Sequence, residues 1–552
     1  FREFSIVVSG SVIISSFAAL TFTPMLATKL LIKREQQSWF YRKTEPFFEG
    51  MNRVYSQSLA AFLKRRWIAL PFTIVTILLI GVLWNTIPAE MAPLEDRSQI
   101  SINTMGAEGV TYEYIRDYTE DINHLVDSII PDAEAVTARV SSGSGNVRIT
   151  LKDMKDRDYT QMEVAEKLSK AVQKKTMARS FVQQSSSFGG RRGGMPVQYV
   201  LQATNIEKLQ EVLPKFMTKV YENPVFQMAD VNLKFSKPEA RININRDKAS
   251  IMGVSTKNIA QTLQYGLSGQ RMGYFYMNGK QYEILGEINR QQRNKPADLK
   301  GIYIRSDNGN MVQLDNLIEL TGGIAPPKLY RYNRFVSATI SAGLADGKTI
   351  GQGLDEMDKI AKETLDETFR TALTGDSKEY RESSSSLMFA FILAIVLIYL
   401  ILAAQFESFK DPLIIMLTVP LAIAGALVFM YFGDITMNIF SQIGIIMLIG
   451  LVAKNGILIV EFANQKQEAG EDKMRAIKDA SLQRLRPILM TSASTILGLI
   501  PLAFATGEGC NQRIAMGTAV VGGMLISTLL TMYIVPAIYS YVSTNRSKLK
   551  TE

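Results

Sequence analysis

The sequence has very little of the residues on which disulfides, metal centres and much acid–base catalysis depend. Cys510 is the only cysteine and His124 the only histidine among 552 residues. A single cysteine excludes an intrachain disulfide and leaves the redox state of the compartment open. His124 lies in a polar, helix-like stretch, so we expect it at the surface. No metal site is expected, because a centre built on several histidines would need more of them than the chain has.

Nucleotide-binding patterns are also missing. Residues 343–349, GLADGKT, have one residue too few between the glycines for the phosphate-binding loop G-x-x-x-x-G-K-[ST]. No other segment offers such a pattern. The energy for any transport would then come from an ion gradient, and no cofactor is expected.

Long apolar runs, by contrast, are abundant, and seven are long enough to cross a bilayer as helices. Between the second and third lies a hydrophilic insert of roughly 290 residues, enough for two or more small domains. The fold class predicted is an α-helical polytopic membrane protein with a large α+β insert. The expected spans are 5–28, 67–87, 384–404, 412–432, 439–463, 487–506 and 513–542.

The net charge of +9 is concentrated in three segments, 29–66, 466–486 and 546–550. All three fall on one side of the membrane if the spans alternate. The positive-inside rule makes that side the cytoplasm, which places the insert in the periplasm of a Gram-negative cell. The basic residues are therefore topology signals, and no nucleic-acid partner is expected.

The insert shows two similar runs of periodic segments. From 99 to about 181 the order is strand, helix, strand, strand, helix, strand, which is the split βαβ arrangement. The second run has strands over 197–203, 231–235 and 334–342, with helices over 206–221 and 351–365. It is interrupted from about 240 to 321. We therefore expect two ferredoxin-like units, the second carrying an inserted domain.

A lysine in the interior of a membrane span is the most informative single residue. Lys454 lies within the apolar run 439–464, and a charge at that depth is usually retained for ion or substrate transfer. Glu461, seven residues later, projects from nearly the same helical face. The alternative is a lysine that snorkels to the headgroups.

The following span, expected to begin near Pro487 because proline suits the first turn of a helix, supplies hydroxyl groups. Arg484 and Arg486 would lie at its cytoplasmic mouth. Hydroxyls in a membrane helix also commonly bond to their own backbone or permit close packing. A lysine ammonium donates three hydrogen bonds and accepts none, so its natural partners are carboxylates. The hydroxyl residues are Thr491, Ser492, Ser494 and Thr495.

Five stretches resemble the hydrophobe/amphiphile branch of the RND (resistance-nodulation-division) efflux transporters, the relatives of the acriflavine-resistance B protein. The resemblance covers essentially the whole chain. The stretches are 1–28, 253–263, 402–427, 450–464 (GLVAKNGILIVEFAN) and 484–507 (RLRPILMTSASTILGLIPLAFATG).

The resemblance implies a secondary transporter, a proton-driven drug antiporter of the inner membrane, and not an enzyme. It would act as a homotrimer or RND heterotrimer with a periplasmic adaptor and an outer-membrane channel, and it would export amphiphilic small molecules from the periplasm or the lipid bilayer. Family members have twelve spans and two inserts. We thus expect this chain to be the C-terminal half, with the proton-binding aspartates in the missing half.

The resemblance also implies residue roles and boundaries. Lys454, Thr491 and Arg484 would form the proton relay, supported by Glu461, Asn455 and Ser492. The boundaries implied are 1–28 and 67–88 for spans, 29–66 for a cytoplasmic linker, 98–180 for a first porter subdomain, 181–238 with 323–370 for a second, 239–322 for a docking subdomain, 384–542 for a five-helix bundle and 543–552 for a tail.

One region departs from the family pattern. Multidrug members often carry an aromatic, glycine-rich switch loop, whereas residues 141–146 here read SSGSGN. The nearest aromatic candidates for a substrate pocket are Phe181, Phe188 and Tyr199, and core packing explains each of them equally well. The basic, glycine-rich segment 185–196 is either a linker or an element beside the substrate path.

Three alternatives stay open. A heavy-metal exporter shares the architecture, although the methionines show no clustered spacing. A lipid exporter of the same superfamily is the second. The third is a non-transporting receptor or scaffold with a periplasmic domain, which would not require Lys454.

Overall fold

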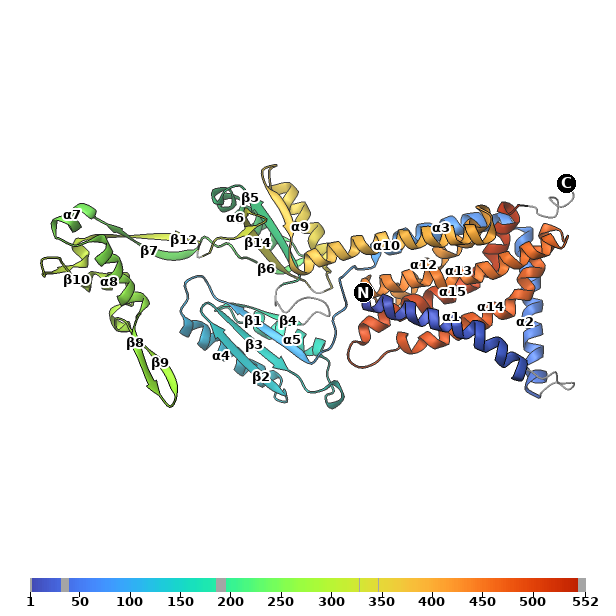
Figure 1. Ribbon diagram of the computed structural model, residues 1–552, viewed down its shortest axis with the longest axis horizontal. Helices are drawn as coiled ribbons and strands as arrows, with labels where there is room; N and C mark the ends of the chain where they lie inside the picture. Colours follow the sequence, from blue (N-terminus) through green and yellow to red (C-terminus); the bar gives the residue numbers. More distant parts are fainter. Residues whose placement is uncertain (1, 31–38, 185–194, 327, 346, 545–552) are drawn as a thin grey trace.

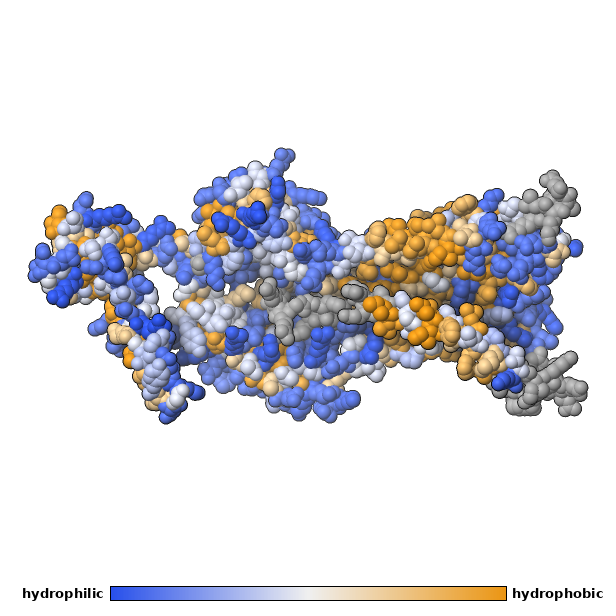
Figure 2. All heavy atoms as spheres, in the orientation of Figure 1, coloured by the Kyte–Doolittle hydropathy of each residue, from blue (hydrophilic) through white to orange (hydrophobic). Residues whose placement is uncertain are grey.

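The protein is elongated, with a helical bundle at one end, two α+β units in the middle and a small lobe at the far end (Figure 1). The structure, a computed structural model, describes residues 2–30, 39–184, 195–326, 328–345 and 347–544. Apolar side chains form a band over the bundle (Figure 2). Hydrophilic side chains cover much of the two units and the end of the bundle farthest from them, here called its outer end. This is the pattern of a protein whose helical bundle crosses a membrane.

Seven helical segments in the described part of the chain are long and apolar enough to cross a membrane, which confirms the number expected. The sixth begins earlier than predicted, so Pro487 lies inside its helix and not in the first turn. Proline removes one helical hydrogen bond from the carbonyl of Gln483, an exposed residue near the outer end of the bundle, where water can replace it. The segments are α1 (Arg2–Leu30), α3 (Ala69–Thr86), α10 (Gly375–Phe406), α11 (Lys410–Met416) with α12 (Thr418–Phe432), α13 (Ile439–Glu468), α14 (Lys473–Ala503) and α15 (Cys510–Val542).

The segment between the first two spans, for which the sequence predicts only a linker, contains a helix, α2 (Trp39–Lys64). It lies across the outer end of the bundle (Figure 1). The buried hydroxyl of Tyr55 donates a 2.6 Å hydrogen bond to the carbonyl of Met532 in α15. Leu59 and Leu63 of α2 are buried with Tyr55 in the same core as Val535 of α15, so α2 packs against the bundle along an apolar face.

Small residues allow α12 and α15 to approach closely. A Cβ added at Gly522 would lie 2.4 Å from the Cβ of Phe429, and one at Gly425 would lie 3.1 Å from the carbonyl oxygen of Gly522. Glycine at such contacts lets helix backbones meet where the hydrophobic effect gives no drive to associate. The result is a central pair of buried helices against which α13 and α14 pack.

The first soluble unit is a four-stranded antiparallel sheet with the order β2-β3-β1-β4 and two helices, which confirms the order of elements expected from the periodicity. Its core includes Ile102, Val147 and Leu168, all fully buried. His124 is exposed, as expected. The elements are β1 (Gln99–Met105), α4 (Tyr112–Ile129), β2 (Ala135–Ser141), β3 (Ser144–Thr150), α5 (Gln161–Gln173) and β4 (Arg179–Gln184).

The second unit repeats this topology with a different chain path. Its strands run β6-β14-β5-β15, with the short β13 pairing beside β6 on the edge of β14. Each strand therefore occupies the place of its counterpart in the first unit. The elements are β5 (Val197–Ala203), α6 (Ile206–Glu222), β6 (Phe226–Val231), β13 (Arg331–Tyr332), β14 (Phe335–Leu344), α9 (Ile350–Thr364) and β15 (Arg370–Leu373).

The prediction of a strand over 231–235 was wrong, because β6 precedes this stretch and ends at Val231. Asn232 closes the sheet there: its side-chain oxygen accepts a 2.8 Å hydrogen bond from the Thr339 N–H, and its own N–H donates to the Thr339 carbonyl. The alternating apolar residues after Val231 therefore lie outside strand β6.

The residues inserted into the second unit form the small lobe at the far end of the molecule. A two-stranded ribbon connects this lobe to the second unit. In the ribbon β7 (Lys237–Ile244) pairs with β12 (Ile318–Ala325), so the chain leaves and returns side by side. The lobe contains α7 (Arg246–Ile251), α8 (Thr256–Ser268), the hairpin β8 (Gln270–Met277) and β9 (Lys280–Gly286), and the pair β10 (Tyr303–Arg305) and β11 (Met311–Gln313).

Candidate functional site

Lys454 lies near the middle of α13, a 30-residue helix. The helix begins at a full capping arrangement, in which the side chain of Asn438 accepts from the N–H groups of Phe440 and Ser441. About fifteen residues of α13 precede Lys454, which places it roughly 22 Å along the axis at 1.5 Å per residue. The ammonium is therefore near the centre of the apolar band and not at its rim.

The Lys454 ammonium donates to a hydroxyl on the neighbouring helix α14. Its Nζ lies 3.4 Å from Oγ1 of Thr495, which also bonds to the carbonyl of Thr491. Thr491, the hydroxyl that the family resemblance implied, donates to the carbonyl of Ile488 at 3.1 Å in its own helix. The lysine thus meets the hydroxyl one turn further along α14.

A buried polar triangle lies next to the lysine. The amide nitrogen of Asn455 is 3.2 Å from Oγ of Ser492 and 3.4 Å from Oγ1 of Thr528, and these two hydroxyls are 3.2 Å apart. All three side chains are buried, and Asn455 Oδ1 has no hydrogen-bond partner among the described residues. Asn455 and Ser492 were predicted as supporting residues. Thr528 on α15 was not, because its relevance appears only once the helices are packed.

The other two charged candidates lie nearer the outer end of the bundle. Glu461 accepts a 2.9 Å hydrogen bond from Gln465, one turn along α13. The guanidinium of Arg484 lies 4.3 Å from the ring centre of Phe462, a cation–π contact. Within the described part of the chain no carboxylate forms an ion pair with Lys454. The structure therefore brings Lys454, Asn455 and Ser492 together, and it leaves Glu461 and Arg484 apart from them.

A second feature is a cavity of about 400 Å³ between the two soluble units, where they meet the bundle. One wall is β4 with Phe181, and the opposite wall is β6 with Gln227 and Met228. The residues that join α3 to β1 form part of the floor, including Met91 and Leu94. The lining is mixed, apolar with a few polar groups, as in pockets that bind small amphiphilic ligands.

The three aromatic candidates have different positions. Phe181 lines the cavity. Tyr199 packs in the core of the second unit beside Phe216, and its hydroxyl donates to Asp358 at 2.8 Å, while burial raises the pKa of its phenol. For Tyr199 the core explanation therefore holds. Phe188 lies outside the described residues.

Ion pairs join the two units beyond the cavity. Arg179 at the start of β4 lies 3.7 Å from Asp230 on β6, which also pairs with Lys234 at 3.0 Å. Lys234 reaches Glu108 of the first unit at 3.9 Å. These contacts bridge the two units beside the cavity.

Comparison with known proteins agrees with this architecture. The model of the AcrB/AcrD/AcrF family matches residues 1–543. An uncharacterized transporter of Haemophilus influenzae is 30% identical over 559 residues, which take in 100% of this chain and 54% of that protein. The chain thus spans about half the length of the curated relative it matches. With its membrane bundle, its lysine site and a match along nearly its whole length, the chain belongs to the AcrB/AcrD/AcrF family of transporters.

Proposed function

We propose that the chain is part of a proton-driven transporter that exports hydrophobic or amphiphilic compounds. The observation that carries the proposal is Lys454 in the middle of α13, held by Thr495 and flanked by the buried Asn455. A cation at membrane depth is costly, and it is retained where charge must be gained and lost during transport.

In the proposed mechanism Lys454 pairs with carboxylates from a part of the protein outside this chain. When those carboxylates bind protons, the ammonium loses its partners and moves along the hydroxyls of α14, between Thr491 and Thr495. Arg484 would stand at the cytoplasmic end of the relay. Such a local change of charge can bias an assembly that has two stable packings.

The cavity between the two units would receive the substrate. On this proposal the units are porter subdomains on the periplasmic side of the inner membrane, and the lobe is the docking subdomain. Hydrophilic residues cover the outer end of the bundle (Figure 2), and the basic run Lys64–Arg66 lies at the end of α2, before α3, which supports this orientation. A trimer with an adaptor and an outer-membrane channel would complete the path.

The test is dye accumulation in a Gram-negative strain that lacks its own efflux pumps. The intact protein, expressed with its adaptor and channel, should lower accumulation, and Lys454→Ala should abolish this effect. The matched control is Lys466→Ala, which removes a lysine of the same helix that pairs with Glu471 at the outer end. Efflux that survives Lys454→Ala at equal expression would contradict the relay, and equal loss in both variants would show a general defect of α13.

A further inference from the structure

The segment 88–96, here called the strap, joins α3 to the first soluble unit and crosses the starts of two membrane helices. Its backbone pairs with the loop before α13. Met437 donates to the Pro88 carbonyl at 2.8 Å, Glu90 donates to the Met437 carbonyl at 3.0 Å, and Ile439 donates to the Met91 carbonyl at 3.3 Å. The strap is therefore hydrogen-bonded to the start of α13, the helix that carries Lys454.

The strap also caps α15 with a carboxylate. Glu95 is 1% exposed, and its two oxygens accept from the backbone N–H of Gln512 at 2.8 Å and of Asn511 at 3.4 Å. The Asn511 side chain in turn donates to the carbonyl of Leu94 at 2.7 Å. The first N–H groups of a helix have no partner within it and carry partial positive charge, so a buried carboxylate is well placed there.

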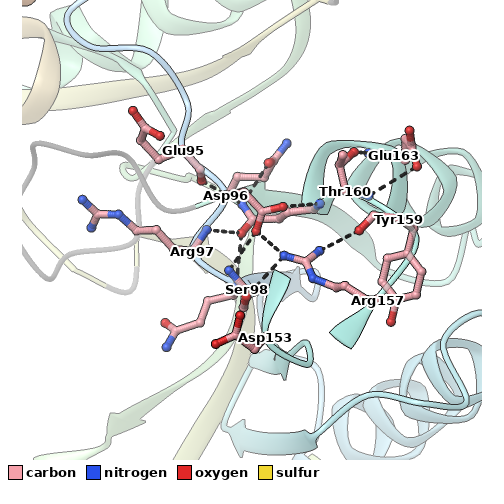
Figure 3. A network of polar contacts seen from close by, with 12 residues as sticks. Glu95, Asp96, Arg97, Ser98, Asp153, Arg157, Tyr159, Thr160 and Glu163 are labelled. Atoms are coloured by element: carbon pink, nitrogen blue, oxygen red, sulfur yellow. Dashed lines mark hydrogen bonds and ion pairs between the residues drawn. The ribbon is translucent and has the colours of Figure 1, made fainter. Parts of the chain in front are cut away.

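Asp96, the residue after Glu95, faces the opposite way, into the first unit (Figure 3). The Asp96 carboxylate forms an ion pair with the fully buried Arg157 and accepts from the N–H of Gln161 at 2.8 Å and of Ser98 at 3.1 Å. The Gln161 side chain returns to the strap by donating to the Glu95 carbonyl at 3.4 Å. Two adjacent carboxylates thus contact the start of α15 on one side and, on the other, the start of α5 and Arg157 just before it in the first unit.

The second unit is attached to a different helix. β15 ends at Leu373 and α10 begins at Gly375, so sheet and helix are almost continuous. The Ser377 hydroxyl of α10 accepts from the N–H of Gln198 in β5 at 2.8 Å. The cavity therefore lies between one unit held by α13 and α15 and another held by α10.

We propose that the strap transmits movement at the Lys454 site to the cavity, with Glu95 as the positioning residue that couples α15 to the first unit. This inference rests on the proposed function. α15 also carries Thr528, which bonds to the Asn455 and Ser492 side chains beside the lysine. A shift of α13 and α15 relative to α10 would then change the separation of the two cavity walls. Breaking the buried Asp96–Arg157 ion pair would be costly, so the first unit is expected to move together with the strap.

The test measures how fast a cysteine in the cavity reacts with a maleimide. Gln227→Cys on β6 supplies the reporter in a Cys510→Ser background, because Gln227 is exposed and lines the cavity. The rate is measured in the intact membrane protein with Lys454 or Lys454→Ala, each combined with Glu95 or Glu95→Gln. We expect Lys454→Ala to change the rate by about fivefold, at the low end of measured couplings, and Glu95→Gln to remove most of that change.

Glu508→Gln is the matched control, since Glu508 is an exposed carboxylate just before α15. It should leave the response to Lys454→Ala intact. Asn511→Ala removes the side-chain bond to the Leu94 carbonyl and leaves Glu95 in place. It should weaken the response, and it is the variant to use if Glu95→Gln folds poorly.

A response to Lys454→Ala that is equal with Glu95 and Glu95→Gln, in folded protein, would overturn the inference while leaving the proposed function in place. If Lys454→Ala did not change the maleimide reaction rate even with Glu95 present, the Lys454 site would not be coupled to the cavity. Parallel dye-efflux measurements then separate the inference from the proposed function: loss of efflux in Lys454→Ala would retain proton-driven export and reject only the strap.

Discussion

Lys454 of α13 donates a hydrogen bond to Thr495 of the neighbouring membrane helix α14, with 3.4 Å between Nζ and Oγ1. Hydrogen bonds to charged groups contribute more than neutral ones. We expect Thr495→Val to lower efflux by about tenfold, the scale of losing one such bond. The comparison is Thr491→Val, measured by dye efflux at equal expression. If Thr495→Val left efflux unchanged and Thr491→Val abolished it, the functional partner of Lys454 would be Thr491, one turn earlier in α14.

The Asn455 triangle should behave as a unit. Removing the amide by Asn455→Ala leaves a void and withdraws a donor from two buried hydroxyls, which typically costs about 1–3 kcal/mol. Ser492→Ala and Thr528→Val should each lower the unfolding temperature, and the double variant should lose less than the sum. Ser494→Ala, an exposed hydroxyl on the same helix, is the control and should have little effect. Strict additivity would show that the two hydroxyls do not interact.

The spans and the soluble units could be predicted because their signals are local. A run of apolar residues identifies a membrane helix by itself, and the sheet periodicity of the first unit needs no knowledge of distant contacts. The exception within the second unit is instructive: the stretch after Val231 alternates like a strand, yet Asn232 ends the pairing. At this boundary the side-chain oxygen of Asn232 accepts from the Thr339 N–H, a contact between segments that are distant in the sequence.

The contacts of the candidate site could be predicted only in part. Lys454 stands out as a charge in an apolar run, but the choice between Thr491 and Thr495 depends on how α13 and α14 cross. Thr528 carries no signal until α15 is placed beside both. Glu95 and Asp96 form an acidic pair in a short connection before a strand, and nothing in the sequence states that they face different partners.

The buried ion pair of the first unit should matter far more than an exposed one. Asp96→Asn would leave the fully buried Arg157 without its charge partner, a change that typically costs about 3–5 kcal/mol. We expect faster cleavage of the first unit in limited proteolysis of the purified protein. The control is Glu113→Gln, which breaks the exposed pair with Arg290. Arg290 lowers the pKa of the Glu113 carboxyl to about 2, but solvent screens this pair, so little change is expected. Similar cleavage rates for both variants would contradict the assignment.

Glu90 on the strap should make stability depend on pH. Burial raises the pKa of its carboxyl, although the hydrogen bond from the Thr436 hydroxyl opposes the rise. The folded state therefore binds this proton more tightly than the unfolded state. The resulting stabilisation is fully present below the unfolded pKa and is lost as the pH rises through the folded pKa.

Glu90→Gln removes that charge while its side-chain oxygen can still accept from Thr436. We therefore expect Glu90→Gln to raise the unfolding temperature at about pH 8, where the burial of this carboxyl costs stability, and to have less effect near pH 4. Thermal unfolding of the purified protein at both pH values measures this difference, with Glu508→Gln as an exposed carboxylate for comparison. A shift of the same size at both pH values would mean that packing, and not the buried charge, sets the stability of the strap at Glu90.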